Sequence, residues 1–357
     1  MEQNKNSNTA LITGADGFLG SHLTDFLLDK DFQVYALKRP DGEIKNLSHY
    51  TDGKKKFPEE EKLSFSSHSI DSKIQFPTTN KNLRILECDL NNSELLDQLI
   101  KEIRPNYIYH FGAQPFVIPS WEDPRYTIKT NVIGTINIFE PLKKYEIDCR
   151  VIVACSSAEY GTTAETINRA LRESDPLKAV HPYGISKIGT ELMARQYHLN
   201  FGIDAVNLRF FNQTGPRKIN DACSDFVQRI AQIELGMCEP VIEVGNLSPY
   251  RDIMGIKDSL QAVWIATQKG KAGETYNVCS NRKIKIKDVL DIVLGFSSKE
   301  IHVKENVSKK LRKTDEDIIL GDNSKLKMLG FEINQSIENL LEEMFDYWIE
   351  FYSSNKK

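Results

Sequence analysis

A tyrosine and a lysine four residues apart form the pair in this sequence best suited to moving a proton. Tyr183 and Lys187 stand in the pattern Y-x-x-x-K at the start of a stretch with helical periodicity. An i, i+4 spacing puts both side chains on one face of a helix. The ammonium is expected to lower the pKa of the phenol, because a nearby opposite charge favours the ionised form. The phenol could then exchange a proton with a substrate hydroxyl or carbonyl.

Two serines strengthen this interpretation. Ser156 and Ser157 directly follow the apolar run 151–154. If that run is a strand of a parallel sheet, the hydroxyls lie at the carboxyl edge of the sheet, where ligands bind in such folds. Ser156, Tyr183 and Lys187 together would form the proton-handling half of a hydride-transfer site.

A glycine-rich turn supplies a site for the other half. The sequence TGADGFLG at 13–20 follows an apolar run and opens a helical pattern. Glycines in this position allow a tight turn and a close approach of backbone to a pyrophosphate, which the helix N-terminus then binds. The spacing predicts a dinucleotide site whose candidate residues are Gly14, Asp16, Gly17, Phe18, Leu19 and Gly20.

The end of the second apolar run bears on the choice of cofactor. An acidic residue there would accept a hydrogen bond from the ribose 2′-hydroxyl of NAD. This run ends instead in Lys38 and Arg39, and two cations can pair with a 2′-phosphate. We therefore favour NADP(H), with NAD(H) as the alternative. Further candidates for cofactor contact follow the third and fourth runs, namely Asp89, Leu90, Phe111, Gly112, Ala113 and Gln114.

An alternation of apolar runs and helical patterns must position these residues. Strand–helix–strand alternation implies parallel pairing with helices on both faces. The expected fold is therefore α/β, a Rossmann-type doubly wound parallel sheet with a smaller mixed α/β C-terminal substrate domain. The apolar runs are 10–12, 33–37, 83–86, 107–109, 151–153 and 205–208, and the helical patterns include 21–28, 94–103, 130–142 and 188–198.

Proline and glycine punctuation after residue 212 marks the expected domain boundary. We assign 1–211 and 256–281 to the cofactor-binding domain and 212–255 and 282–357 to the substrate domain. The polar stretch 41–82 interrupts the alternation. We interpret it as a long loop insertion, either solvated or functional.

Composition excludes several classes of protein. The 357 residues carry a formal charge of −4, which argues against a nucleic-acid binder with a basic surface. We find no apolar run long enough for a membrane helix and no apolar core of a secretory signal near the start. The six cysteines show neither C-x-x-C pairs nor metal-ligand spacing. We expect reduced thiols, no metal site and a cytoplasmic protein.

Taken together, the glycine turn and the Ser–Tyr–Lys set resemble the extended short-chain dehydrogenase/reductases that act on nucleotide sugars. Several segments resemble the branch of GDP-mannose 4,6-dehydratases and GDP-4-keto-6-deoxymannose reductases more closely. The long loop favours the dehydratase, whereas the surroundings of Ser156 and the segment 193–197 favour the reductase. The matching segments are NVIGT at 131–135, RFFNQTGP at 209–216, GNL at 245–247, YRD at 250–252, YNVCS at 276–280, LR at 311–312 and GDNSK at 321–325.

The resemblance implies a nucleotide-diphosphate sugar as substrate, with a GDP-linked sugar favoured. By matching position, Asn131 would belong to the cofactor site, and Lys187 would hold the ribose. Arg251 would pair with the diphosphate, since arginine binds phosphate well. The full set of implied substrate residues is Pro115, Phe116, Ser157, Asn212, Arg217, Arg251, Arg312 and Asp315.

One departure from the family pattern bears on the reaction. The 4,6-dehydratases place a glutamate two residues before the Tyr-Gly that closes the serine motif, and it takes part in the loss of water. Here Tyr160 closes the motif and Ala158 stands at that position, with Glu159 one residue later. On a strand, one residue reverses the side-chain direction. We therefore expect Glu159 to point away from the site unless a bulge shifts it.

These observations favour an NADP(H)-dependent oxidoreductase acting at carbon 4 of a nucleotide sugar, similar to a GDP-4-keto-6-deoxymannose reductase. The alternatives are a 4,6-dehydratase with Glu159 in the site, a 4-epimerase, and a non-catalytic dinucleotide-binding regulator. Pro115 and Phe116 replace the small or polar residues usual in the family, so the sugar could differ. The resemblance also implies a homodimer through helices 130–142 and 188–198, with a tetramer possible.

Overall fold

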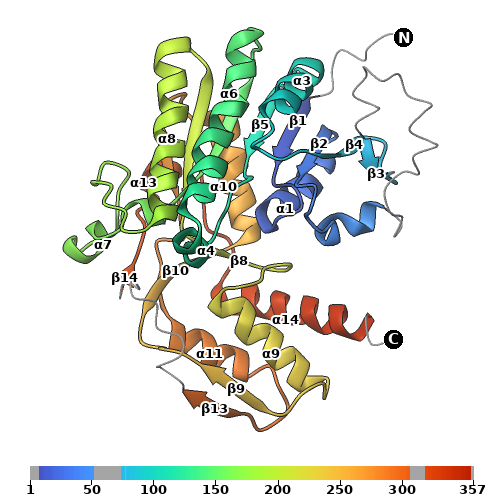
Figure 1. Cartoon of the computed structure of the whole chain (residues 1–357). Helices are drawn as coiled ribbons and strands as arrows, with labels where there is room; N and C mark the ends of the chain where they lie inside the picture. Colours follow the sequence, from blue (N-terminus) through green and yellow to red (C-terminus); the bar gives the residue numbers. More distant parts are fainter. Residues whose placement is uncertain (1–7, 52–73, 77, 306–317, 355–357) are drawn as a thin grey trace. The chain divides into compact units, whose positions relative to one another are not determined.

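The computed structural model describes residues 8–51, 74–76, 78–305 and 318–354 (Figure 1). Arg312 and Asp315 therefore lie outside the described residues. The chain forms two compact units. The first contains 1–159, 181–209 and 263–276, and the second contains 160–180, 210–262 and 277–357. The segments 160–180, 210–211, 256–262 and 277–281 thus fall in the second unit, whereas the sequence analysis assigned them to the first.

An eight-stranded sheet forms the centre of the first unit. Its order is β11-β7-β6-β5-β1-β2-β4-β3. The pairs β1–β2, β1–β5, β2–β4 and β5–β6 are parallel, and β3 pairs antiparallel with β4. The predicted α/β Rossmann-like class is confirmed. The strands are β1 (Thr9–Thr13), β2 (Gln33–Lys38), β3 (Ile74–Phe76), β4 (Leu83–Glu87), β5 (Tyr107–His110), β6 (Arg150–Ser156), β7 (Asp204–Phe210) and β11 (Thr275–Val278).

Helices flank this sheet, as the apolar strands require. The helix α6 (Gly134–Lys144) contacts both α3 (Ser93–Ile103) and α8 (Pro182–Phe201), and the three cover a core that includes Leu11, Ile108 and Val151 (Figure 1). The helix α1 (Phe18–Leu28) meets the second half of α10 (Ile256–Lys269) through an edge-on contact of Phe26 with Trp264. Shorter elements are η1 (Lys45–Tyr50), α4 (Val117–Glu122), α5 (Pro124–Ile128), η3 (Lys129–Ile133) and η4 (Ser157–Glu159).

The stretch 41–82 differs from the expected structureless loop. Its described part contains the 3-10 helix η1 and the strand β3, which extends the sheet beside β4. The helix η1 is tied to α1, because the Tyr50 hydroxyl donates to Asp25 Oδ1 at 2.8 Å. The sequence analysis missed these elements because the stretch lacks the apolar periodicity by which strands and helices are recognised.

The second unit has its own helical core. The helices α9 (Ala222–Glu234), α11 (Ile286–Leu294) and α14 (Ile337–Ser354) pack together around residues such as Ile230, Leu290 and Trp348. Its strands are β8 (Asn212–Thr214), β9 (Val241–Val244), β10 (Tyr250–Gly255), β12 (Lys283–Lys285), β13 (His302–Glu305) and β14 (Ile318–Ile319), and its short helices are α7 (Thr163–Thr166) and α13 (Ser324–Lys327).

Asp252 organises the β10 sheet of this unit. Its buried carboxylate accepts hydrogen bonds from the Ser280, Asn281 and Gly321 backbone N–H groups at 2.6, 3.0 and 3.1 Å. Burial raises the pKa of this carboxyl to about 6. Among the described residues, no helix is both long and apolar enough to cross a membrane.

Candidate functional site

The candidate residues of the first unit gather where five parallel strands end. The glycine turn follows β1, and Lys38 closes β2. Asp89 comes after β4, Gln114 after β5, and Ser156 closes β6. Because the carboxyl ends of parallel strands share one edge, this is the edge at which α/β folds bind ligands.

The glycine turn has the shape that a dinucleotide needs. Gly14 has a φ of +68°, in the region that disfavours residues with a Cβ. A Cβ on Gly20 would collide with the carbonyl oxygen of Gly14 and lie 2.8 Å from Ala15 Cα. Gly17 is the N-cap of α1 and provides no side-chain cap. The turn therefore brings bare backbone to a helix N-terminus, which is where the pyrophosphate of a nicotinamide dinucleotide would be held.

Lys38 and Arg39 differ in their availability, which corrects the expectation that both meet a 2′-phosphate. Lys38 is 2% exposed, and its ammonium donates to Glu87 Oε1 at 2.9 Å and to the Arg39 carbonyl at 2.8 Å. This is a buried ion pair whose cation already has two acceptors. Arg39 is exposed, and its Nη1 lies 3.4 Å from the Tyr126 hydroxyl. Arg39 alone of the two is placed to meet a ligand.

Helix α8 carries the Y-x-x-x-K pair, and its start is fixed by local capping. His181 Nδ1 accepts the backbone N–H of Gly184 at 2.9 Å, and Pro182 occupies the first turn. Burial lowers the pKa of His181, so the ring stays neutral and able to accept. The cap sets the position of Tyr183 in the first turn of the helix.

The Tyr183 phenol lies beside Ser156. Burial raises the pKa of Tyr183 to about 12, and a hydrogen bond with the Ser156 side chain works against that rise. Ser156 Oγ also accepts the backbone N–H of Ala158 at 3.2 Å. The serine hydroxyl is thereby positioned next to the phenol, as the sequence suggested.

Lys187 acts differently from the expectation that it lowers the pKa of Tyr183. Its Nζ donates to the Ala154 carbonyl at 2.7 Å, and this hydrogen bond joins α8 to the end of the strand β6. On balance the pKa of Tyr183 is raised, because burial is the largest influence on the phenol. Lys187 is itself buried, and burial lowers its pKa.

Asn131 ties two parts of the site together. It lies in the π-helix η3, a rare form that is frequent at functional sites. Its Oδ1 accepts Gln114 N–H at 2.7 Å, and its Nδ2 donates to the Gln114 carbonyl at 3.0 Å and to Ser186 Oγ at 2.8 Å. Its amide atoms all have protein partners. Asn131 therefore positions the loop after β5 against α8.

A buried histidine that the sequence analysis overlooked extends this network to the glycine turn. His110 Nδ1 lies 3.0 Å from Thr13 Oγ1, and His110 Nε2 lies 3.0 Å from Thr135 Oγ1. Burial lowers its pKa to about 3, so the ring is neutral. Thr13 Oγ1 accepts Gly112 N–H at 2.9 Å, and the Thr135 hydroxyl donates to the Asn131 carbonyl at 2.6 Å.

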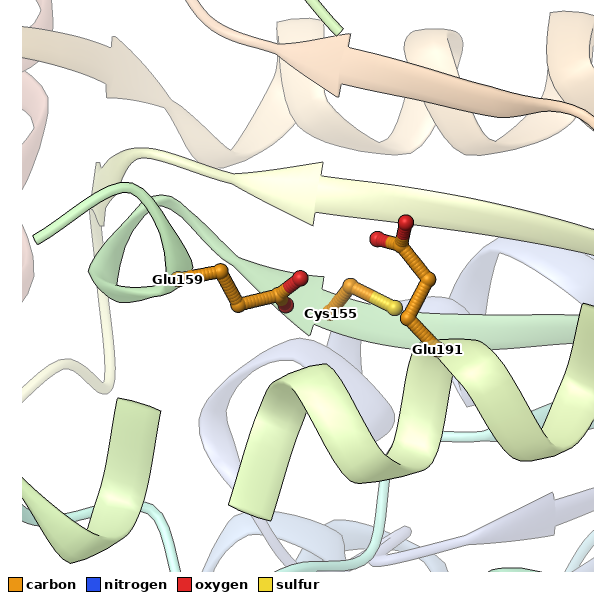
Figure 2. A group of neighbouring side chains, drawn as sticks. All are labelled: Cys155, Glu159 and Glu191. Atoms are coloured by element: carbon orange, nitrogen blue, oxygen red, sulfur yellow. The ribbon is translucent and has the colours of Figure 1, made fainter. Parts of the chain in front are cut away.

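Glu159 points into the interior because it lies on a 3-10 turn, and not because of the alternation along a strand that was expected. The strand β6 ends at Ser156, and residues Ser157–Glu159 form the 3-10 turn η4. Glu159 is fully buried, and its Oε1 accepts Ser156 N–H at 2.7 Å. The side chain lies with those of Cys155 and Glu191 in one buried cluster (Figure 2).

Arg209 completes this buried cluster. Its Nε and Nη2 donate to both carboxylate oxygens of Glu191, at 2.8 and 2.6 Å, and its Nε lies 3.5 Å from Glu159 Oε2. The sequence analysis quoted Arg209 only as part of a family segment. The four-residue step from Lys187 to Glu191 along α8 is the signal that could have placed Glu191 near the site.

The remaining candidates fall in both units. In the first unit, Asp89 Oδ1 accepts from Asn91, Leu90 is buried, and Phe111, Gly112, Ala113 and Ser157 are half-buried. Pro115 and Phe116 are exposed. In the second unit, Asn212 and Arg251 lie on the paired strands β8 and β10, and Arg217 has a φ of +67°.

Comparisons with known proteins agree with this fold. The family model described as GDP-mannose 4,6 dehydratase matches residues 11–344. A GDP-mannose 4,6-dehydratase of Yersinia enterocolitica is 28% identical, over 94% of this chain and 92% of its own length. A GDP-6-deoxy-D-mannose reductase of Pseudomonas aeruginosa is 26% identical, over 73% of this chain and 85% of its own.

A solved structure shares the fold along the whole chain. The RMD protein of Pseudomonas aeruginosa, complexed with NADPH, has a TM-score of 0.77 at 22% identity and covers 97% of this chain and 100% of its own. The match of the family model over most of the chain shows the family. This chain belongs to the GDP-mannose 4,6-dehydratase family, a group of nicotinamide-dependent short-chain dehydrogenase/reductase enzymes of nucleotide-sugar metabolism.

Proposed function

We propose that this protein is an NADP(H)-dependent oxidoreductase that acts at carbon 4 of a nucleotide-diphosphate sugar, in the manner of a GDP-4-keto-6-deoxymannose reductase. The observation that carries the choice is the serine motif. Ala158 stands where the dehydratase pattern has its glutamate. The neighbouring Glu159 is buried, accepts a hydrogen bond from Ser156 N–H and lies beside Arg209. An alanine cannot move a proton, so loss of water between carbons 5 and 6 has no acid–base group here.

Reduction at carbon 4 needs only groups that the site retains. A bound nicotinamide would supply the hydride. Tyr183, protonated because burial raises its pKa to about 12, would donate its proton to the carbon-4 oxygen. Ser156, whose side chain hydrogen-bonds the Tyr183 phenol, would hydrogen-bond the same sugar oxygen. Lys187 holds the start of α8 against β6 through the Ala154 carbonyl.

The first test is net consumption of the cofactor. Purified protein mixed with NADPH and GDP-4-keto-6-deoxymannose should oxidise one NADPH for each sugar reduced, measured by nicotinamide absorbance. A dehydratase or an epimerase recycles its cofactor and would show no net loss. Turnover of GDP-mannose without NADPH loss would contradict the reductase assignment and favour the dehydratase.

Arg39 supports the preference for NADP(H), because it is the exposed cation at the end of β2. Arg39→Ser should raise the KM for NADPH about 10–100-fold, the loss expected for a charge-assisted hydrogen bond to a phosphate. The KM for NADH should change little, because NADH lacks the 2′-phosphate. Steady-state kinetics with both cofactors measures the difference.

A matched control for this prediction is Lys81→Ser. Lys81 is an exposed cation two residues before β4 begins, at the opposite edge of the sheet from the glycine turn. Its loss should leave both KM values unchanged. Equal losses for NADPH and NADH in Arg39→Ser would contradict the assignment of the 2′-phosphate to Arg39.

We also propose contacts with the nucleotide sugar for each of the substrate candidates named from the sequence. Phe116 and Pro115 would border the sugar, with Ser157 nearby. Arg251 would pair with the diphosphate, because a guanidinium group binds phosphate in a bidentate manner. Asn212, on the adjacent strand, would meet the diphosphate or the sugar, and Arg217 is a further candidate for substrate contact. Arg312 and Asp315, which lie outside the described residues, would contact the nucleoside. A GDP-linked sugar is favoured by the relatives' names.

A homodimer through α8 is also proposed. Ile185, Leu192 and Leu199 are spaced seven residues apart and are 52, 51 and 67% exposed, so they form one apolar stripe along the helix. Ile133 at the end of η3 is 43% exposed. Apolar side chains in such a stripe are typical of a helix that packs against a second copy.

Leu192→Arg should therefore weaken self-association. The substitution occurs in both copies of a two-fold interface, and the dissociation constant should rise by at least about 30-fold, as for a central interface residue. Size-exclusion chromatography with light scattering over a dilution series measures this. Met328→Arg, at a residue 79% exposed in the second unit, is the control and should leave the mass unchanged. A monomeric wild-type protein would contradict the dimer.

A further inference from the structure

Two buried glutamates lie close together in the cluster of Cys155, Glu159, Glu191 and Arg209. Glu159 from η4 and Glu191 from α8 are both buried, and each has a carboxylate oxygen within 4.8 Å of Cys155 Sγ and of the other glutamate (Figure 2). Arg209 on β7 donates two hydrogen bonds to Glu191. Its distance to Glu159 Oε2 is 3.5 Å, too long for a strong hydrogen bond.

The two oxygens of Glu159 have different surroundings. Oε1 accepts Ser156 N–H at 2.7 Å, whereas Oε2 is buried and has no hydrogen-bond partner among the described residues. A buried carboxylate oxygen without a donor is costly, because ionised oxygens lose their hydration. If the proton is placed on Oε2, the group becomes a donor, and a side-chain hydrogen bond with Glu191 is among the interactions that raise the pKa of Glu159.

We propose that Glu159 is held as a neutral carboxylic acid, sharing its proton with Glu191, and that it is a positioning residue for Ser156 and Tyr183. Its Oε1 fixes the Ser156 backbone through the N–H bond. Its neutrality keeps a negative charge away from the Tyr183 phenol, which becomes anionic when it gives up its proton.

The groups that face Glu159 support the neutral form. Burial raises the pKa of Glu159 well above its usual value, and the charge of Glu191 raises it further, while Arg209 and the Ser156 N–H work against this. Lys187 on α8 faces Glu159, but its Nζ is hydrogen-bonded to Ala154. Cys155 on β6 stays a thiol, because burial raises its pKa well above the usual value.

A divalent cation fits this cluster less well than a proton. Both oxygens of Glu191 already accept from Arg209, and a bound cation would face the guanidinium at close range. A shared proton adds no such repulsion and needs no further ligand. We therefore place a proton, and not a metal ion, on Glu159 Oε2.

The consequence for turnover is tested by a pair of variants, and this part rests on the proposed function. Glu159→Ala removes the acceptor for Ser156 N–H and should lower kcat about tenfold, the worth of one hydrogen bond. Glu159→Gln should recover most of that loss. Its amide oxygen can accept the same N–H, and its NH₂ can donate to Glu191 as the acid does.

The alkaline limb of the kcat–pH profile of Glu159→Gln should lie at the same pH as in the wild type. A downward shift of that limb in Glu159→Gln would mean that Glu159 is charged, which overturns the proposal.

The protonation itself is measured without any substrate. Infrared spectroscopy of the full chain at neutral pH should show the C=O band of a buried carboxylic acid, shifted in D₂O. Glu159→Gln should abolish the band, and Glu165→Gln, at an exposed glutamate, should leave it unchanged. Absence of the band in the wild type overturns the proposal even if the reductase activity is found. A band that survives in Glu159→Gln and disappears in Glu191→Gln overturns it as well. A band that behaves as expected in a protein without reductase activity supports the proton and counts against the proposed function alone.

Discussion

Replacing Tyr183 by phenylalanine should lower kcat by about 10²–10⁴-fold, the usual contribution of a positioned general acid. The phenol lies beside Ser156, and its pKa of about 12 keeps it protonated at neutral pH. Phenylalanine retains the ring and removes only the proton donor. The measurement is single-turnover oxidation of NADPH with GDP-4-keto-6-deoxymannose, with dinucleotide binding followed separately by fluorescence.

Binding should survive in this variant, because the glycine turn after β1 does not depend on the phenol. Tyr145→Phe is the matched control. Its hydroxyl also has a side-chain hydrogen-bond partner, Asp97 at 2.6 Å, but Tyr145 lies just after α6 ends and away from the strand ends of the site. Tyr145→Phe should keep wild-type turnover. Full activity in Tyr183→Phe would remove the tyrosine from the mechanism.

Replacing Arg209 by methionine should destabilise the protein by about 3–5 kcal/mol, the cost of leaving one partner of a buried ion pair without its counter-ion. The side chains of Arg209 and Glu191 are 4 and 7% exposed, so water offers little compensation. Glu191 would lose two hydrogen bonds at once. The free energy of unfolding is measured by denaturant titration.

The control for Arg209 is Arg172→Met. Arg172 pairs with Asp322 at 3.0 Å, but its side chain is 59% exposed, and a surface pair contributes about 0–1 kcal/mol. The two variants make the same chemical change at different depths. A loss in Arg209→Met no larger than in Arg172→Met would mean that Glu191 gains a proton when the arginine is lost, and that the cluster tolerates neutralisation.

Local sequence patterns were sufficient for the fold class and for part of the site. The glycine turn, the end of β2 and the Y-x-x-x-K pair were predicted correctly as features of strand ends and of a helix start, because each is defined by neighbours within a few residues. The alternation of apolar runs likewise predicted a parallel sheet. The stretch 41–82 escaped prediction, since η1 and β3 depend on α1 and β4 for their contacts.

The sequence by itself determined which residues stand at the carboxyl edge of the sheet, because strand–helix alternation implies parallel strands, whose carboxyl ends share one edge. The order of the strands came from the tertiary structure. The tertiary structure decided which of them are available. Lys38 is hydrogen-bonded to Glu87, which lies 49 residues away in sequence. Asn131 is hydrogen-bonded to Gln114 and Ser186. Glu159 lies in a buried cluster that includes Arg209. Such pairings join residues remote in sequence, and burial then makes them strong by removing water, so no local pattern could have shown them.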